Sequence, residues 1–232
     1  MIEVKNLHKS FGDSQVLKGI STIFEKGKTN LIIGQSGSGK TVLLKCLLGL
    51  FDYQKGSIGY DDKLFLSLSA NEKRTLRSQI GMVFQGGALF DSLTIAENVM
   101  FPLRMFTKQS QSEMEERVNS ALKRVNLENA HHKMPSEASG GMQKRVAIAR
   151  AIVIDNLIQE ITKEFDIVTV INSHDMNSVM EIGEKIVFLK DGLKAWEGSK
   201  DTIFKTDNEV VTDFVYSSNL FKKVRKMYLD DL

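Results

Sequence analysis

Hydrophobic and polar residues alternate at the start of the chain, which is typical of a half-buried β-strand. Ile2 and Val4 are separated by a charged residue, and Leu7 follows in the same stretch. Residues 16–24 form a second such stretch after a turn at Gly12–Asp13–Ser14, so we expect it to pair antiparallel with the first. The sequence therefore predicts an antiparallel β region at the N-terminus.

A continuous apolar run, Leu31–Ile33, predicts a strand buried on both faces, and it leads directly into a glycine-rich turn. The turn follows the pattern G-x-x-x-x-G-K-T and comprises Gly34, Gln35, Ser36, Gly37, Ser38, Gly39, Lys40 and Thr41. Residues 42–48 are mostly apolar and predict a helix. Glycines let backbone N–H groups approach phosphate oxygens, and a helix N-terminus adds partial positive charge. Because Lys40 can bind the β- and γ-phosphates and Thr41 can ligate Mg²⁺, the turn predicts a nucleoside triphosphate site.

Residues 91–137 have a different, helical pattern. Leu93–Phe101 is apolar and predicts a helix that ends near Pro102. Ser112 and Glu115 have the spacing of a capping box, in which a serine and a glutamate three residues later cap the start of a helix. The apolar residues that follow recur at helical spacing and are expected in the core: Met114, Val118, Ala121, Leu122 and Val125. We interpret residues 91–137 as a helical insert.

Two further predicted strands end on polar side chains. Ile80–Phe84 predicts a buried strand that ends at Gln85, and Ile167–Ile171 predicts another that leads to His174. Open α/β sheets place their ligand-binding groups at such strand ends. Gln85 and His174 are therefore candidate site residues.

The rest of the chain adds a helix start, a hairpin and a tail. Ser139 is a good N-cap, and Gly140 and Gly141 leave the following helix N-terminus open to an anion. The dipeptide Asp191–Gly192 between two apolar stretches predicts a β-hairpin. Residues 207–232 predict a helix with a basic patch near its end.

The composition is typical of a globular α/β protein. The 232 residues are 42% hydrophobic and 26% charged, which suits one large domain. A net charge of +2 gives no support for a nucleic-acid partner, and no apolar stretch is long enough to predict a transmembrane helix. The single cysteine, Cys46, is expected in the core of a protein from a reducing compartment. These features predict a cytoplasmic protein.

Five motifs follow one another in a fixed order: Phe11, residues 34–41, Gln85, Ser139–Met142 and His174. This order, which covers nearly the whole chain, resembles that of the ATP-binding subunits of ABC transporters. The resemblance implies a single α/β domain, 1–232, of the P-loop NTPase class. Its RecA-like core, with the N-terminal antiparallel β subdomain, would comprise residues 1–90 and 138–206, beside the helical insert 91–137 and a tail, 207–232.

The resemblance also implies a role for each motif. In that family the aromatic residue, here Phe11, stacks on adenine, and the lysine, here Lys40, binds the phosphates of ATP. Thr41 and Gln85 would bind Mg²⁺, and the catalytic roles would fall on Lys40, Gln85 and His174. The γ-phosphate held by the opposite subunit is contacted by the helix start and the histidine, which here are Ser139, Gly140, Gly141, Met142 and His174.

As a member of that family, the protein would be a transport ATPase. Two copies would form a homodimer around ATP and drive an integral membrane permease, docked on the helical insert at the cytoplasmic face of the membrane. The family signature usually reads L-S-G-G-Q, whereas residues 138–142 read A-S-G-G-M. The final methionine, and Asp175–Met176 after the histidine, look like the Mla-like subgroup, which moves phospholipid with an MCE-type lipid-binding partner. A lipid cargo is therefore expected.

One element of the family pattern is missing. The family has a short apolar strand ending in Asp-Glu after the signature helix; the Asp orders Mg²⁺ and the Glu polarises the attacking water. Here Ser139 and His174 lie only 35 positions apart, and the residues between them predict one helix of about 25 residues. Asp155 and Glu160 fall within that helix, so they do not replace the lost carboxylates.

Two explanations of the missing strand follow. The sequence omits about two dozen residues, or the protein is a true deletion that binds ATP and does not hydrolyse it normally. Because a parallel sheet needs its central strands, the omission is favoured. Beside the transport ATPase, two other functions stay open: an ATP-binding, hydrolysis-deficient module, and a soluble ABC-type factor of translation or repair.

Overall fold

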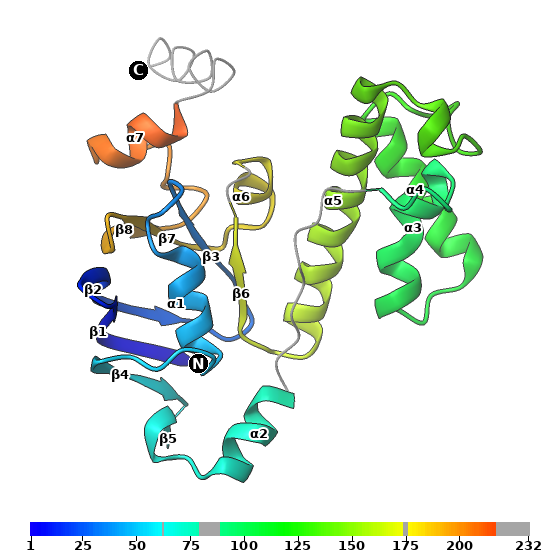
Figure 1. The fold of residues 1–232 in the computed structure, drawn as a ribbon. Coiled ribbons are helices and arrows are strands. Elements are labelled where there is room, and N and C mark those ends of the chain that lie inside the picture. The colour runs from blue at the N-terminus through cyan, green and yellow to red at the C-terminus, as the bar shows by residue number, and fades with distance from the viewer. Residues whose placement is uncertain (62, 79–88, 174–175, 217–232) are drawn as a thin grey trace. The chain divides into compact units, whose positions relative to one another are not determined.

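The computed structural model describes residues 1–61, 63–78, 89–173 and 176–216 (Figure 1). The chain divides into two compact units: Met1–Gly81 with Ile161–Leu232, and Met82–Glu160. The predicted strand Ile80–Phe84, Gln85, His174 and the basic end of the tail lie outside the described residues.

An antiparallel sheet forms the N-terminal part of the first unit, as the alternation of polar and apolar residues predicted. Its strands lie in the order β2-β1-β4-β5. β1 (Ile2–Phe11) pairs antiparallel with β2 (Ser14–Phe24), and β4 (Lys55–Tyr60) pairs with the other edge of β1 and with the short β5 (Lys63–Leu64). The hairpin places Phe11, the candidate base-stacking residue, at the end of β1.

A second sheet contains the strand that precedes the glycine-rich turn. Its order is β6-β3-β7-β8, with β3 (Thr29–Gly34) parallel to both β6 (Thr169–Asn172) and β7 (Lys185–Lys190). β8 (Leu193–Gly198) returns antiparallel to β7 through the predicted hairpin. Every residue of β3 is buried, in agreement with its unbroken apolar run.

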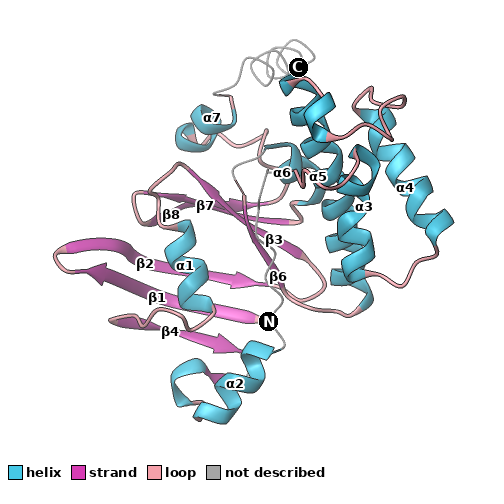
Figure 2. Cartoon of the chain, turned by 45° about the vertical axis from the view of Figure 1, so that its right-hand side comes forward, coloured by secondary structure: helices cyan, strands magenta, loops and turns pink. Residues whose placement is uncertain are grey.

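Helices cover both faces of this second sheet. Figure 2 shows α1 (Lys40–Leu47) beside the strands. The apolar face of α1 packs into a cluster that contains residues of both sheets, including Ile32. Leu31 and Ile33 point to the other face, where they contact the cluster formed with α6 (Met176–Ile182) and α7 (Glu209–Val215). Two shorter elements, η1 (Phe65–Ser67) and α2 (Ala70–Ser78), follow the antiparallel sheet.

The second unit is helical. It contains α3 (Ile95–Phe106), α4 (Gln111–Arg124), the 3₁₀ turn η2 (Pro135–Glu137) and most of α5 (Gly140–Glu164). The predicted apolar stripe lies in its core, as Met114, Val118, Ala121, Leu122 and Val125 all belong to one buried cluster. No helix in the described ranges has the length and apolar character needed to span a membrane.

Two boundary predictions in this unit were wrong. α3 does not end at Pro102 but continues to Phe106, because Pro102 and Leu103 are buried and their packing outweighs the lost backbone hydrogen bond. The capping box of α4 is formed by Ser110 and Glu113, two residues before the predicted pair. Both pairs have the same spacing, and only the earlier one stands where the chain enters the helix.

α5 is one continuous helix of 25 residues, as the sequence predicted (Figure 1). Asp155 and Glu160 lie within it, so neither ends a strand. Among the described strands β6 pairs only with β3 and stands at the edge of its sheet. All four of its residues are only half-buried, in contrast to β3. A strand in the interior of a parallel sheet would normally be buried on both faces.

Candidate functional site

The glycine-rich turn joins the carboxyl end of β3 to the N-terminus of α1 in the first unit. Gly34, Gly37 and Gly39 have φ angles of 143°, 80° and 100°, which other residues rarely adopt. A Cβ on Gly34 would lie 2.1 Å from the carbonyl oxygen of Leu189, whereas a Cβ on Gly37 would meet nothing within 4 Å. Gly34 is thus required by packing, while Gly37 leaves open space at the tip of the turn.

Lys40 closes the turn on itself. Its Nζ donates to the carbonyl oxygens of Gly34 at 2.8 Å and Gln35 at 2.7 Å. Burial lowers the pKa of Lys40 below the usual value of a lysine, because the surroundings solvate the ammonium less well than water does. The ammonium is therefore held at the turn with few partners for its charge, a position that a phosphate group would satisfy.

The start of α1 offers unused hydrogen-bond donors. Gly39 caps the helix without a side-chain hydrogen bond, and the first turn of α1 contains no acidic residue. The hydroxyl of Ser38 is buried and has no hydrogen-bond partner among the described residues. An uncapped helix N-terminus beside an unsatisfied hydroxyl and an ammonium fits the phosphates of a nucleotide.

Thr41, the predicted magnesium ligand, has an exposed side chain that contacts the end of β6. Its Oγ1 accepts a hydrogen bond from Nδ2 of Asn172 at 3.3 Å. A threonine hydroxyl and an amide are oxygen donors of the kind that Mg²⁺ prefers. These donors fit a magnesium ion bound together with the phosphates. Gln35 and Ser36 are exposed at the tip of the same turn.

Phe11 lies at the end of β1 and is 45% exposed. Its ring makes an edge-to-face contact with Phe51, with centroids 5.2 Å apart and planes at 75°. The ammonium of Lys9 lies 4.7 Å from the centroid of Phe11, and that of Lys45, on α1, lies 5.0 Å from the centroid of Phe51. An exposed, electron-rich ring held in this way is suited to stack on a base.

The loop that carries Phe51 is fixed to the backbone of β1 by hydrogen bonds from the side chain and the backbone of Gln54. The side-chain amide of Gln54 accepts from Ser10 N at 2.9 Å and donates to Ser10 O at 3.2 Å, and Gln54 N donates to His8 O. Because this loop directly follows α1, one short stretch of chain connects the phosphate-binding turn to the aromatic pair.

Three residues of this site were missed by sequence reasoning: Lys9, Phe51 and Asn172. Phe51 could have been identified from the sequence, because it is an aromatic residue just after the helix that follows the glycine-rich turn. Asn172 interrupts the apolar run that forms β6, and a polar residue at the end of a buried strand could have been noted. Lys9 had no distinguishing pattern, because a lysine on a strand is usually a solvated side chain.

The predicted serine-glycine-glycine motif lies in the second unit, at the start of α5. Ser139 caps the helix as expected, with its Oγ accepting from Met142 N at 3.3 Å. Ser139, Gly140 and Gly141 are exposed, and a Cβ on Gly140 would meet nothing within 4 Å. The helix start is therefore accessible to a ligand or a partner chain.

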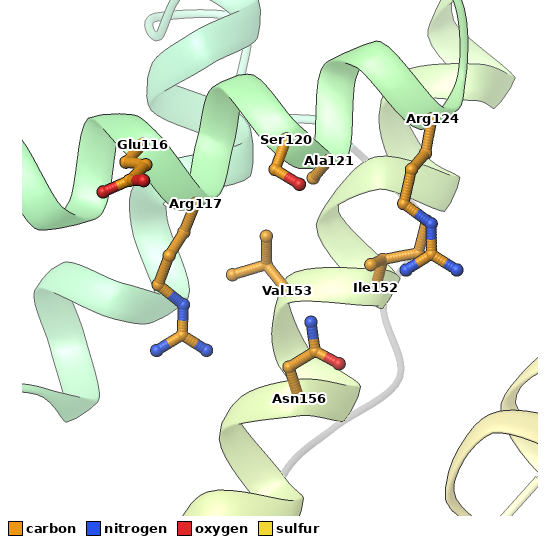
Figure 3. A pocket seen from close by; sticks show the side chains of 8 residues that line it. All are labelled: Glu116, Arg117, Ser120, Ala121, Arg124, Ile152, Val153 and Asn156. Atoms are coloured by element: carbon orange, nitrogen blue, oxygen red, sulfur yellow. The ribbon is translucent and has the colours of Figure 1, made fainter.

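A pocket of about 240 Å³ also lies in the second unit, between α4 and α5 (Figure 3). It is lined by Glu116, Arg117, Ser120, Ala121, Arg124, Ile152, Val153 and Asn156. Arg117 there donates to both carboxylate oxygens of Glu160, at 2.9 and 2.8 Å. None of the predicted site residues lines this pocket, and the guanidinium of Arg117 is already paired with Glu160. We therefore do not assign nucleotide binding to this pocket.

Comparisons with known proteins identify the family of the chain. The family model described as "ABC transporter" matches residues 17–159. The chain is 38% identical to the "Methionine import ATP-binding protein MetN" of Clostridium tetani, with 90% of this chain and 73% of that protein covered. It is 33% identical to the "Probable ribonucleotide transport ATP-binding protein mkl" of Mycobacterium leprae, with 92% and 68% covered.

A solved structure shares the fold. The "Dimeric structure of a post-hydrolysis state of the ATP-binding cassette MJ0796 bound to ADP and Pi" superimposes with a TM-score of 0.53. The two chains are 30% identical, and the match covers 86% of this chain and 99% of that one. The mixed α/β arrangement described above is thus the arrangement of an ATP-binding cassette.

The alignments also bear on the missing strand. The alignment with the Clostridium tetani protein extends over 234 positions, more than the 232 residues of the whole chain, although only 90% of the chain takes part. That relative therefore has about two dozen residues with no counterpart here, a number that matches the length expected of the missing segment.

Proposed function

Because the chain belongs to the ABC transporter family, we propose that residues 34–41 bind Mg-ATP and that the protein is the ATP-binding subunit of a transporter. The observation that supports this most directly is the arrangement at the turn. Lys40 donates hydrogen bonds to two carbonyl oxygens. Beside it lie a helix start without a side-chain cap and the hydroxyl of Ser38, which has no hydrogen-bond partner among the described residues. ATP-binding cassettes of this family are ATPases that dimerise and act with a membrane permease.

In this proposal the turn works by positioning and by charge. The ammonium of Lys40 moves from the carbonyl oxygens to the β- and γ-phosphates, and the N–H groups at the start of α1 bind the same oxygens. Thr41 would hold a magnesium ion, which would neutralise phosphate charge. Gln85 and His174 keep their proposed roles toward the attacking water and the γ-phosphate, and Ser139–Met142 would contact the nucleotide of a second subunit.

Phe11 is proposed to stack on the adenine, and the contact with Phe51 is proposed to fix the orientation of the Phe11 ring. Replacing Phe51 with alanine removes an aromatic contact worth about 1 kcal/mol, so we expect ATP to bind about 3- to 10-fold more weakly. Inorganic tripolyphosphate, which has no base, is expected to bind with unchanged affinity in a competition titration. The Phe51→Tyr variant keeps the ring and serves as the control; equal weakening of both ligands would show that Phe51 acts on the phosphate turn instead.

The helical unit is proposed to dock on the permease. α3 presents an apolar surface formed by Phe101 and Met105, one turn apart. The ring of Phe90 is tilted against that of Phe101, with centroids 4.7 Å apart, and Phe106, which follows Met105, is also exposed. Exposed apolar surface of this kind usually marks an interface between proteins. It would place the ATP-binding subunit against the cytoplasmic face of the membrane.

Introducing a charge on this apolar surface by mutation tests the proposal that the protein docks on a permease. We expect Met105→Glu to lower co-purification with the integral membrane permease by about 10-fold or more, because an exposed apolar side chain that the interface would bury is replaced by an unpaired charge. Binding of Mg-ATP to the isolated subunit should not change. Lys123→Glu, at an exposed position on α4, introduces the same charge and should keep the permease. Co-purification with ribosomes and no membrane protein would favour the soluble ABC-type factor.

The cargo is proposed to be a phospholipid, carried with an MCE-type partner. Support comes from Met142 in the last position of the signature and from Asp175–Met176 in the sequence. The two relatives named above carry names for methionine import and ribonucleotide transport, so these two cargo classes are the direct competitors. Mass spectrometry of the purified transporter complex separates them: an MCE-type subunit with bound lipid supports the proposal, and a soluble amino-acid receptor contradicts it.

A hydrolysis-deficient module is the second candidate function, and the fold provides its support. α5 takes the place where the family pattern has an acidic strand, and β6 stands at the edge of the described sheet. Nucleotide would then bind and promote dimerisation with little turnover. The two candidates share the same binding site and differ only in the rate of phosphate release.

A further inference from the structure

Asn172 connects the phosphate-binding turn to a strand far away in the sequence. β3 and β6 run parallel, with Ile32 opposite Asn172, so both strands end at the edge of the sheet where the turn and α1 begin. From the end of β6 the amide nitrogen of Asn172 donates to Oγ1 of Thr41 at 3.3 Å. Nothing in the family motifs above assigns a role to this asparagine.

The end of β6 is fixed, so the contact is defined by the fold. Ser173 N donates to Ile32 O at 3.2 Å and extends the parallel pairing past Asn172, and the Ser173 side chain is fully buried. At the other end of β6, Asn30 Nδ2 donates to Thr169 O at 3.0 Å. The pairing of β6 with β3 therefore fixes the position of Asn172 beside Thr41.

The chemistry of the two side chains explains why an amide suits this position. A threonine hydroxyl has one proton to donate and two lone pairs, and an asparagine amide can donate through nitrogen or accept through oxygen. When the oxygen of Thr41 ligates a cation, its proton needs an acceptor. Turning the amide of Asn172 would present Oδ1 as that acceptor, whereas a valine or isoleucine, like the two residues before it in β6, could neither donate nor accept.

We propose that Asn172 is a positioning residue for magnesium, acting through the hydroxyl of Thr41. Its amide fixes the direction of the hydroxyl so that the oxygen lone pairs of Thr41 face the cation. The inference rests on the proposed Mg-ATP site and adds a residue that selects for the metal-bound form of the nucleotide.

The test measures ATP binding as a function of Mg²⁺ concentration, and separately in EDTA. For Asn172→Leu we expect the Mg²⁺ concentration at half-maximal binding to rise about 10-fold, as is usual when a partner of a metal ligand is lost. The affinity for ATP in EDTA should stay at the wild-type value. Asn172→Asp keeps an acceptor oxygen, so its Mg²⁺ midpoint should return to or below that of the wild type.

A double-mutant cycle with Thr41→Val completes the test. If Asn172 acts only through the Thr41 hydroxyl, Asn172→Leu should have no further effect on the Mg²⁺ midpoint once that hydroxyl is gone. An unchanged midpoint in Asn172→Leu, or an equal loss of affinity with and without Mg²⁺, overturns the inference while leaving the nucleotide site in place. Failure of the wild-type chain to bind ATP under either condition instead overturns the proposed function itself.

Discussion

Replacing Lys40 with alanine is expected to weaken the binding of Mg-ATP by about 100-fold, because a charge-assisted interaction with two phosphates is worth about 3 kcal/mol. The ammonium is already positioned over the turn, with its pKa lowered by burial. The fold should be preserved, since the side chain of Lys40 donates hydrogen bonds, among the described residues, to carbonyl oxygens of its own turn. A titration with a fluorescent ATP analogue measures the affinity, and thermal unfolding without nucleotide checks the fold.

Lys26→Ala is the matched control for this variant. Lys26 is exposed in the turn that leads into β3, so its replacement removes the same charge away from the glycine-rich turn. We expect the Lys26 variant to bind Mg-ATP within about 2-fold of the wild type, as is usual for exposed charges. Equal affinities in the wild type and in Lys40→Ala would contradict the assignment of the turn.

Restoring the missing segment is expected to raise the rate of phosphate release by about 100-fold or more, the usual contribution of a positioned general base. The experiment inserts the unmatched residues of the Clostridium tetani relative between Ile154 and Asp155, within α5. An acidic strand in the insert would pair with the edge of β6 that has no partner among the described strands. The affinity for ATP should change little, since the turn and α1 are untouched.

The control for this chimera is the same insert with its Asp-Glu pair changed to Asn-Gln. It should improve thermal stability as the active insert does, because the strand is present, but leave turnover at the level of the uninserted chain. The intact mass of the starting protein is measured first, since a value of 26.1 kDa shows that the segment is truly lacking. Rapid turnover by a chain of that mass would contradict the role given to the missing strand.

Much of the fold could be predicted from the sequence because the signals are local. The alternation in β1 and β2, the apolar run of β3, the glycine-rich turn, the Asp191–Gly192 hairpin and the length of α5 are all properties of neighbouring residues. The phosphate-binding part of the site belongs to the same class. Its residue spacing is dictated by the approach of one backbone segment to phosphate oxygens.

Features that depend on distant residues could not be predicted. Nothing near Pro102 shows that Leu103 will be buried and will carry α3 one turn further. The contact of Phe51 with Phe11 depends on how the loop after α1 folds back on β1, and that of Asn172 with Thr41 depends on the order of strands in the sheet. Such tertiary contacts override or add to local preferences.

The central claim is that the backbone and Lys40 at residues 34–41 bind the triphosphate of ATP. Isothermal titration calorimetry of the purified chain with ATP and Mg²⁺ tests it most directly. We expect a saturable heat with one nucleotide bound per chain, competed by tripolyphosphate and lost in Lys40→Ala. The absence of any heat, or a heat that persists unchanged in Lys40→Ala, would contradict it.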